Sequence, residues 1–531
     1  MTDILLVQPP IRDFYLTAKR TVPYGLACIA STLEAEGFSV EILDGLATSK
    51  SKIIDRPPEM AYLADFYGKP DLSPFGLFHH YRHFGYSFEH IGREAAASGA
   101  FLVGISSLFT PYSGEALETA RVIKAAAPRC KIVLGGHHPT EMPESVLQCR
   151  EVDFVLRGEG EASMGLLAKA LQAGSDLESI PGIAFIKHNG RLFANPPAFM
   201  NDPNRYPLPA LHLVKHRHYR RGNGGSAVVT ASRGCPLRCS YCSVGGPAHG
   251  GYRQRSLDTV LSEIQTAVLD HGARFIDFED ENISLSRSWF LDLLSGIRER
   301  CGGIDVELRA MNGLFPPSLD DEVIRWMRVT GFKTLNLSLG TTSPRQLKRF
   351  GRPDVRQAFD EALRSAETHG LDAVGYIIVG APDQDPVDSV ADLLYLAERR
   401  VLAGVSVYYP SPGSAEFEIC SDMGLLPERF SLMRSTALPL SHTTTREESI
   451  TLLRLGRILN FMKSIALRNH AVKNPAVERI DPELDRTDIG KILLALFLQD
   501  GNIRGATPEG DVYDHRISRA LTTKFLEGLT G

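Results

Sequence analysis

Short apolar runs alternate with stretches of helical periodicity over residues 1–200 of this 531-residue chain. The apolar runs are rich in Val, Ile and Leu and stop at Gly, Ser or Pro, as buried parallel strands do. We expect strands at residues 3–8, 39–44, 101–107, 131–136 and 153–158. Between them, helical spacing of apolar side chains marks residues 24–37, 113–128 and 161–174. This alternation predicts a Rossmann-like parallel α/β sheet.

Two segments depart from this rhythm. Residues 182–187 and 191–196 flank an Asn-Gly pair at 189–190, which is the preferred two-residue turn, and they predict a hairpin. Residues 45–98 form an insertion rich in His, Tyr and Phe, most of all at 77–90. A loop this long within a compact domain is usually functional or disordered. We place it over the ligand side of the sheet, with a lid over the substrate as the hypothesis for 77–90.

The alternation resumes after residues 201–225, which are rich in Pro, Arg, His and Gly and which we interpret as a linker. Six further strands are predicted, each followed by a helical stretch, at residues 226–232, 274–280, 305–311, 334–340, 373–380 and 404–410. Their crossovers should be right-handed, as those of parallel βα units are. The strand signal ends near residue 426. Helical patterns at 446–468 and 488–500 predict a small helical region over residues 426–531.

Composition narrows the class of protein. The chain is longer than one hydrophobic core usually serves, so two or three domains are expected. Its net charge of -5, with no basic run that would follow a nucleic-acid backbone, argues against a nucleic-acid partner. No stretch approaches the ~20 apolar residues of a transmembrane helix, and the N-terminus lacks a signal-peptide pattern. We expect a soluble, cytoplasmic protein, with peripheral membrane contact left open.

Three cysteines in the segment RGCPLRCSYCSV carry the strongest chemical signal: Cys235, Cys239 and Cys242. Iron–sulfur clusters are held by thiolates, four when ligation is complete. Three on one loop therefore indicate a [4Fe–4S] cluster with one open iron that can bind a small molecule and pass it an electron. A structural zinc site needs four ligands, usually as two pairs. The other cysteines are scattered singly, at Cys28, Cys130, Cys149, Cys301 and Cys420.

Small and polar residues follow the predicted strands of the N-terminal sheet, where ligands of open α/β sheets bind. Glycine and small side chains let a large planar ligand approach the backbone. The same residue types also make ordinary turns. From the residues alone, a ligand site and ordinary turns are therefore equally supported. The positions are Pro9, Ser106, Ser107, Thr110, Tyr112, Gly135, Gly136, His137, His138, Glu159 and Gly160.

The cysteine motif, with Tyr241 before its last cysteine, resembles the signature of radical S-adenosylmethionine (radical SAM) enzymes. The segments PYGLACIASTLEAEGF, LGGHHPTEMPE and VDFVLRGEGE ahead of it are similar to the cobalamin-dependent, class B methyltransferase-like members. This resemblance implies a [4Fe–4S] cluster, SAM and cobalamin as cofactors. It also implies a partial (β/α)6 TIM-type barrel over residues 226–425 and cobalamin at the strand ends named above. The D-x-H-x-x-G motif is absent, so His137 and His138 are expected to cap a helix or contact the corrin rather than ligate cobalt.

The resemblance also assigns SAM contacts to the strand ends of the barrel. In the segment FEDENIS, Asp280 and Glu281 are expected to accept hydrogen bonds from the SAM amine. Arg309 is expected to pair with the SAM carboxylate. Any one acidic residue at a strand end can equally cap the next helix. The remaining positions assigned to SAM are Tyr241, Ser338, Gly380 and Pro382.

The implied reaction is methylation of an unactivated carbon, or of phosphorus, in a small molecule through a 5′-deoxyadenosyl radical and methylcobalamin. An external donor such as flavodoxin or ferredoxin would supply electrons. The alternative is a non-methylating cobalamin-dependent radical SAM oxidative cyclase or ring-rearranging enzyme, and a non-catalytic sensor is a third. Methylthiotransferases carry three further cluster cysteines in their α/β domain. Cys28, Cys130 and Cys149 do not match them, because the pattern places these in a helix, at a strand entry and at a helix end.

Overall fold

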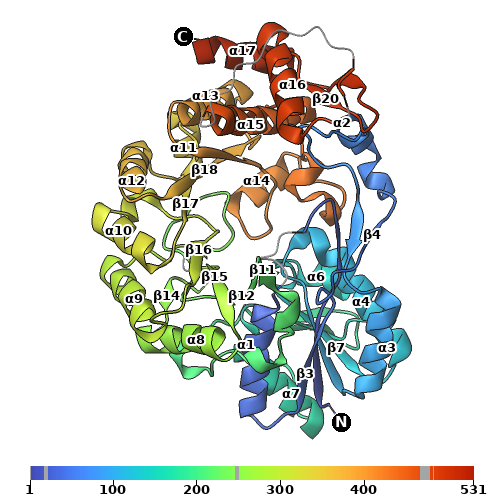
Figure 1. Cartoon of the computed structure of the whole chain (residues 1–531). Coiled ribbons are helices and arrows are strands. Elements are labelled where there is room, and N and C mark those ends of the chain that lie inside the picture. Colours follow the sequence, from blue (N-terminus) through green and yellow to red (C-terminus); the bar gives the residue numbers. More distant parts are fainter. Residues whose placement is uncertain (1, 17–21, 246–249, 467–478, 482, 531) are drawn as a thin grey trace.

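The computed structural model describes residues 2–16, 22–245, 250–466, 479–481 and 483–530. Figure 1 shows an N-terminal α/β body in blue and cyan and a barrel-like body in green and yellow. A mainly helical C-terminal region, in orange and red, lies at the far end of the barrel-like body. In the described part of the chain, no helix is both long and apolar enough to cross a membrane.

The N-terminal sheet has seven strands in the order β10-β9-β8-β7-β6-β1-β3. The parallel strands are β1 (Ile4–Gln8), β3 (Val40–Asp44), β6 (Leu102–Ser106), β7 (Lys131–Gly135) and β8 (Phe154–Leu156). The antiparallel hairpin is β9 (Ile183–Ile186) and β10 (Leu192–Ala194). All seven strands were predicted: the five parallel strands because their Val, Ile and Leu runs are buried on both sheet faces, and the hairpin from its Asn-Gly pair.

Helices cover both faces of this sheet. One apolar cluster joins the sheet to α1 (Tyr24–Ala35) and α7 (Met164–Ala173). The other joins it to α3 (Phe88–Ser98) and α4 (Ser113–Ala126). Two short helices, α5 (His137–Glu141) and α6 (Pro143–Leu147), follow β7. The sequence placed α3 within an insertion, but it is a regular helix of the domain, capped by the Ser87 side chain.

The rest of the insertion at 45–98 forms secondary structure and part of the hydrophobic core. Its strands β4 (Ser51–Ile53) and β5 (Arg82–Phe84) form a small antiparallel sheet with β2 (Ile11–Asp13). Its helix α2 (Ala64–Tyr67) lies near the C-terminal elements in Figure 1. The Phe75 ring packs 5.6 Å, centroid to centroid, from that of Phe461. Tyr81 is buried against Phe14. The aromatic residues thus build core, contrary to the lid hypothesis for 77–90.

The segment at 201–225 is packed on the N-terminal domain rather than being a free linker. Ala210, Val214 and Tyr219 are buried in the apolar cluster of α1 and α7. The Ala210 amide donates to the Ala27 carbonyl at 3.0 Å. The Tyr219 hydroxyl donates to the Asp44 carboxylate. These contacts depend on residues far apart in the chain, which the local composition of the segment does not reveal.

The second body contains the six predicted parallel strands in two sheets, β11-β12-β15-β16 and β17-β18-β19, where β11 (Arg220–Arg221) is an added antiparallel strand. The six are β12 (Gly224–Val229), β15 (Ala273–Phe278), β16 (Glu307–Ala310), β17 (Thr334–Gly340), β18 (Asp372–Val379) and β19 (Leu402–Val407). Isolated parallel bridges at Leu308–Phe332 and Leu314–Leu337 join the two sheets. Among the described residues no ladder joins β12 to β19, so the barrel is open, as expected.

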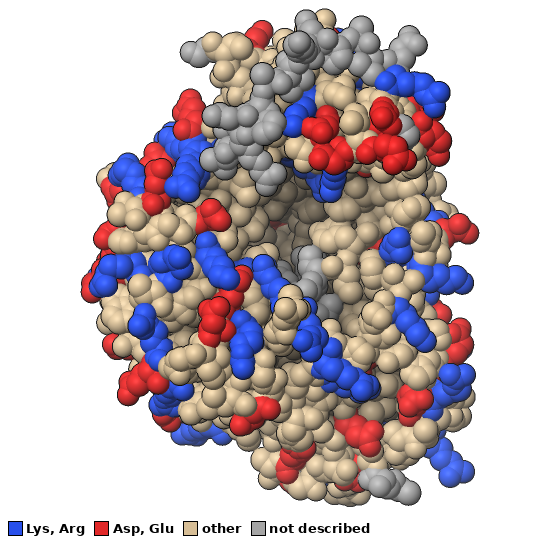
Figure 2. Space-filling model, in the orientation of Figure 1, with Lys and Arg blue, Asp and Glu red and all other residues tan. Residues whose placement is uncertain are grey.

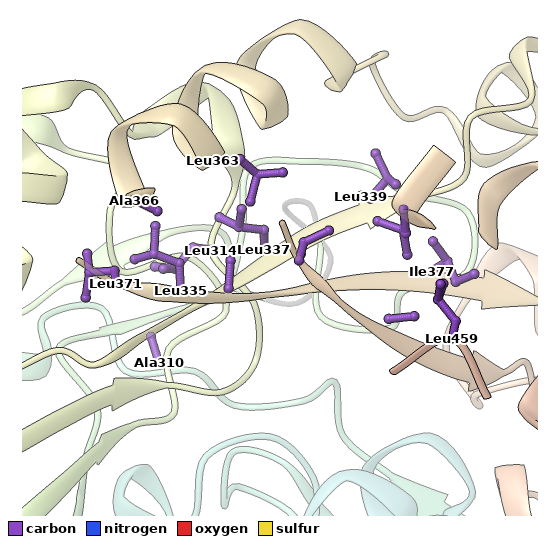
Figure 3. Packing of buried hydrophobic residues seen from close by; sticks show 14 of the residues in the cluster. Ala310, Leu314, Leu335, Leu337, Leu339, Leu363, Ala366, Leu371, Ile377 and Leu459 are labelled. Atoms are coloured by element: carbon purple, nitrogen blue, oxygen red, sulfur yellow. The ribbon is translucent and has the colours of Figure 1, made fainter. Parts of the chain in front are cut away.

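Helices cover the outside of the barrel. They are α8 (Leu257–Leu269), α9 (Arg287–Arg300), α10 (Asp321–Thr330), α11 (Pro344–Phe350), α12 (Arg356–Thr368) and α13 (Pro386–Ala397). Ser256, Asp320 and Asp385 cap α8, α10 and α13 by accepting a backbone N–H. Figure 3 shows Leu335 and Leu337 of β17 packed toward Leu363 of α12. The alternation of β17 therefore buries one face against this helix layer.

The helix α14 (Ala415–Asp422) follows β19, and the C-terminal region beyond it contains α15 (Arg446–Ala466), α16 (Arg486–Asp500) and α17 (Arg519–Thr530). It also contains a hairpin of β20 (Arg504–Ala506) and β21 (Val512–Asp514), so the prediction of helices alone was wrong. Each strand has only three residues, too few to show alternation. Tertiary contact stabilises the hairpin: Asp71 of the insertion accepts from the Ala506 amide at 3.3 Å and lies 2.8 Å from His515 Nε2.

Candidate functional site

The three cysteines of the motif lie on one loop at the carboxyl end of β12. Antiparallel pairing of β13 (Ser232–Arg233) with β14 (Arg253–Gln254) closes the base of this loop, which we call the neck. Cys235 and Cys239 are buried and Cys242 is half-buried, and none is in a disulfide. Among the described residues, no three His, Cys, Asp or Glu side chains form a site for a single metal ion. A [4Fe–4S] cluster gives each thiolate an iron of its own and so tolerates wider spacing.

Burial keeps two of the three thiols protonated when no iron is bound. Burial, followed by the charges of Cys239 and Cys235, raises the pKa of Cys242 to about 11. Burial also raises the pKa of Cys235. Bound iron would offset both effects, because a coordinated thiol is deprotonated. Cys28, Cys130 and Cys149 lie in α1, just before β7 and just after α6, all buried, as the sequence indicated.

Asp280 holds the neck in place. Its carboxylate, just beyond β15, accepts from the Ala231 amide at 3.0 Å and from the amide and hydroxyl of Ser232 at 2.5 and 2.6 Å. The group is buried, and burial raises its pKa to about 7. Both oxygens are thus engaged by the neck, which moves the expected amine contact to Glu281. Burial raises the pKa of Glu281 as well. The charge of Glu281 in turn raises the pKa of Cys235 and of Cys242.

Arg309 is neutralised within the barrel. Its guanidinium pairs with the buried Asp277 carboxylate at 2.6 Å and lies over the Phe275 ring at 4.9 Å. Sequence reasoning placed the SAM carboxylate here because Arg309 comes at a strand end. The pairing with Asp277 leaves less positive charge for an anionic ligand, so this assignment is no longer favoured.

Arg352 is the cation that sequence reasoning missed. It is buried beside the cysteine loop, where its Nη1 donates to the Tyr241 hydroxyl at 3.1 Å and its Nη2 to the Ser338 carbonyl at 2.6 Å. Its Nε has no partner among the described residues, and no described carboxylate pairs with it. Its charge lowers the pKa of Cys235. A buried guanidinium in this state suits a carboxylate ligand. It was missed because it follows the short helix α11, not a strand.

The other positions assigned to SAM lie at the same end of the barrel as the cysteine loop. Tyr241 packs edge-on against Phe350, with ring centroids 4.8 Å apart. Ser338 donates through Oγ to the Leu314 carbonyl at 3.1 Å. Gly380, with φ +76, and Pro382 follow β18. Contact of these four residues with SAM stays a prediction.

At the facing edge of the N-terminal sheet, buried polar atoms lack partners. The Ser107 hydroxyl, the Thr110 hydroxyl and His138 Nδ1 have none among the described residues. Leaving such a group unsatisfied costs about 1–3 kcal/mol. Gly136, with φ +119, brings the backbone so close that a Cβ there would lie 2.7 Å from the Ser107 carbonyl oxygen. A close backbone and unsatisfied donors and acceptors fit a large polar ligand such as the predicted corrinoid.

Both histidines after β7 contact residues outside the N-terminal domain. Burial, followed by the charge of His137, lowers the pKa of His138 to about 4, so the ring is neutral near pH 7. That ring packs 4.9 Å from the ring of Phe430. His137 Nε2 lies 3.0 Å from the Pro412 carbonyl oxygen, in the loop after β19. The carboxyl edges of the two bodies therefore meet here.

Three expected cobalamin positions have other partners. Tyr112 donates through its hydroxyl to Asp13 at 2.5 Å. Glu159 is bound by Arg233 and Arg253 of the neck. A Cβ at Gly160 would lie 2.6 Å from Ile29 Cδ1, so this glycine serves helix packing. The remaining positions, Pro9, Ser106 and Gly135, lie at the same sheet edge, and their contact with cobalamin stays a prediction.

Comparison with known proteins agrees with this architecture. The B12 binding domain family matches residues 78–168, and the Radical SAM superfamily matches residues 229–395. Fold and site thus define a radical SAM enzyme with an N-terminal corrinoid-binding domain. The two matched domains, in this order, are those of cobalamin-dependent radical SAM enzymes.

Relatives cover most or part of the chain. An uncharacterized methyltransferase of Pyrococcus horikoshii is 27% identical over 80% of this chain and 84% of its own length. The anaerobic magnesium-protoporphyrin IX monomethyl ester cyclase of Synechocystis is 25% identical over 53% of this chain and 56% of its own. The structure of the radical SAM methyltransferase TsrM of Kitasatospora setae, with cobalamin and [4Fe-4S] cluster bound, has a TM-score of 0.61. It shares 18% identity over 85% of this chain and 90% of its own, and so supports the fold.

Proposed function

We propose that this protein is a cobalamin-dependent radical SAM methyltransferase that methylates an unactivated carbon, or phosphorus, of a small molecule. One observation carries this proposal. The edge with the three cysteines and the edge with three unsatisfied buried polar groups belong to two bodies whose carboxyl ends touch at His137–Pro412, and His138 packs beside this contact on Phe430 of the C-terminal region. Two cofactors held at these edges would face one shared space.

The bound cofactors supply a carbon-centred radical and a transferable methyl group. The chain's own residues supply the rest. Glu281 and Arg352 would orient the amine and carboxylate of SAM, while Ser107, Thr110 and His138 would bind polar groups of the corrinoid. Figure 2 shows a hollow at the centre of the molecular face, with Lys and Arg side chains along its lower side. A substrate between the two edges would be shielded from bulk water, which protects a radical from side reactions.

A second candidate, an oxidative cyclase, is favoured by the cyclase relative. That relative matches 53% of this chain, whereas the methyltransferase relative matches 80%. The longer match covers more of the chain, so it supports methyl transfer more strongly.

The products distinguish these functions. The protein is reconstituted anaerobically with iron, sulfide and cobalamin, then given SAM and a strong reductant. Methyl transfer predicts S-adenosylhomocysteine that forms only with cobalamin present, together with 5′-deoxyadenosine. Formation of 5′-deoxyadenosine without S-adenosylhomocysteine would contradict methylation and favour the cyclase.

We also propose that a separate one-electron donor, such as flavodoxin or ferredoxin, reduces the cluster. The cluster thiolates are best preserved in a thiol-reducing compartment, which makes the cytoplasm the proposed location. Reduction of the cluster by purified flavodoxin, followed by electron paramagnetic resonance (EPR), tests the donor.

A further inference from the structure

The neck of the cysteine loop is held by acidic residues of the other domain. Arg233 on β13 pairs with Glu161 at 2.6 Å and with Glu159 at 3.3 Å. Arg253 on β14 pairs with the second oxygen of Glu159 at 2.7 Å. Both arginines belong to the two strands that close the loop, and both glutamates follow β8 of the N-terminal sheet. The ion pairs therefore join the cysteine loop directly to the predicted corrinoid domain.

These pairs are shielded from solvent. The side chains of Glu159, Glu161 and Arg253 are 12%, 6% and 13% exposed, and that of Arg233 is 26% exposed. The Met200 amide also donates to Glu159 at 2.6 Å. Burial favours a neutral Glu159, yet the Arg253 hydrogen bond and the Arg233 charge hold its pKa below the ordinary value, so it is ionised. Such charge-assisted pairs restrict geometry more than exposed ones.

A second set of contacts reaches the same neck from α1. The Tyr24 hydroxyl donates to the buried Glu263 of α8 at 2.9 Å and accepts from the Thr230 amide at 3.3 Å. Arg255, just after β14, binds Glu263 at 2.6 Å and the Thr230 carbonyl at 2.8 Å. Asp280 holds the neck from within the barrel. The loop is thus fixed from both bodies at its base.

We propose that Glu159 and Glu161 are positioning residues that fix the [4Fe–4S] loop relative to the cobalamin-binding domain and so set the separation of the two cofactors. This inference rests on the proposed function. The barrel already anchors its own loop through Asp280, so the contacts from the N-terminal domain add a constraint between bodies. Misplacement of reacting groups by about 1 Å can cost about a hundredfold in rate, which gives such a constraint catalytic value.

The first test needs no cofactor. In the variant Glu159→Gln/Glu161→Gln, the arginines of the neck lose both ionic partners. Hydrogen–deuterium exchange of the apoprotein should rise at least about tenfold in the β13 and β14 amides, with β17 and β18 unchanged. The control Glu178→Gln breaks the more exposed pair with Lys187, 2.7 Å apart beside β9 of the hairpin, and should leave the neck unchanged. Unchanged exchange at the neck of the double variant would overturn the proposal.

The second test separates positioning from general stability. In protein loaded with cob(II)alamin and with the cluster reduced by one electron to [4Fe–4S]+, pulsed EPR measures the distance between the two paramagnetic centres. Wild type and Glu178→Gln should give one narrow distance distribution. Glu159→Gln/Glu161→Gln should give a broader or shifted one at unchanged iron and cobalt content, and Glu159→Asp should restore part of the narrow component. An identical distance distribution in the double variant would refute the positioning role of Glu159 and Glu161. Wild-type protein that retains no cobalt would refute the proposed function instead.

Discussion

The two facing edges of this molecule differ in how their buried polar side chains are satisfied. At the edge of the N-terminal sheet, Ser107, Thr110 and His138 each carry a polar atom with no partner among the described residues. At the barrel edge, the carboxylate of Asp280 and the guanidinium of Arg309 are bound by protein groups, and the Nε atoms of Arg309 and Arg352 lack a partner among the described residues. A position at a strand end therefore locates a residue near the site, but its hydrogen bonds decide whether it can bind a ligand.

The largest effect is expected at the barrel edge when one of the three cluster cysteines is removed, because no other residue of the loop replaces its thiolate. Cys239→Ala should lower the iron content after anaerobic reconstitution from about four per chain to nearly none, because three thiolates are needed to hold the cluster. Iron analysis and the visible spectrum measure this. The control Cys301→Ala removes a buried thiol outside the loop and should retain the cluster. Equal iron loss in both variants would contradict the assignment of the loop.

The next effect tests which arginine serves SAM. Arg352→Gln should weaken SAM binding to the reconstituted protein by about 10- to 100-fold, the value of a charged hydrogen bond. Arg309→Gln should leave SAM affinity nearly unchanged but destabilise the fold by about 3 kcal/mol, because it leaves Asp277 buried without its cation. Equilibrium binding and denaturant unfolding measure the two quantities. If Arg309→Gln weakened SAM binding and Arg352→Gln did not, the arginine at the strand end would bind SAM despite its ion pair with Asp277.

At the N-terminal edge, a pH effect is expected from His138 in the cofactor-free protein. Its folded-state pKa of about 4 lies below the unfolded value, so its stabilising contribution is complete above about pH 6.5 and is lost as the pH falls toward 4. The free energy of unfolding of wild type, relative to His138→Gln, should fall by about 2 kcal/mol between about pH 7 and pH 5. Parallel pH profiles for the two proteins would contradict a buried neutral ring.

The smallest effect distinguishes a buried hydroxyl without a hydrogen-bond partner from one that has a partner. Thr110→Val should stabilise the apoprotein by about 1 kcal/mol, because it removes an unsatisfied hydroxyl, and should weaken cobalamin binding about fivefold. In the control Thr119→Val, a buried hydroxyl that donates to the Glu115 carbonyl at 2.8 Å is lost. That variant should be less stable and bind cobalamin normally. Destabilisation by Thr110→Val would mean that its hydroxyl is satisfied in the apoprotein.

The sequence predicted elements that rest on local pattern. The parallel strands of both bodies have buried apolar runs, and the three cysteines lie within eight consecutive residues, so both signals are local. The hairpin β20–β21 and the packed segment 201–225 depend on Asp71 and Asp44, far away in the chain, and were not found.

The roles of Asp280 and Glu159 were assigned less well for the same reason. Their partners lie 49 and 94 residues away, at Ala231 and Arg253. Spacing along the chain identifies a strand end, but only the folded structure shows which side chain already has a partner there.

The central claim is that one chain holds a cluster and a corrinoid at two facing edges. Its most direct test is metal analysis after anaerobic reconstitution with iron, sulfide and hydroxocobalamin, followed by gel filtration. We predict about four irons and about one cobalt per chain, with cobalt retained in Cys239→Ala when iron is lost. Protein that binds iron but retains no cobalt would contradict the account.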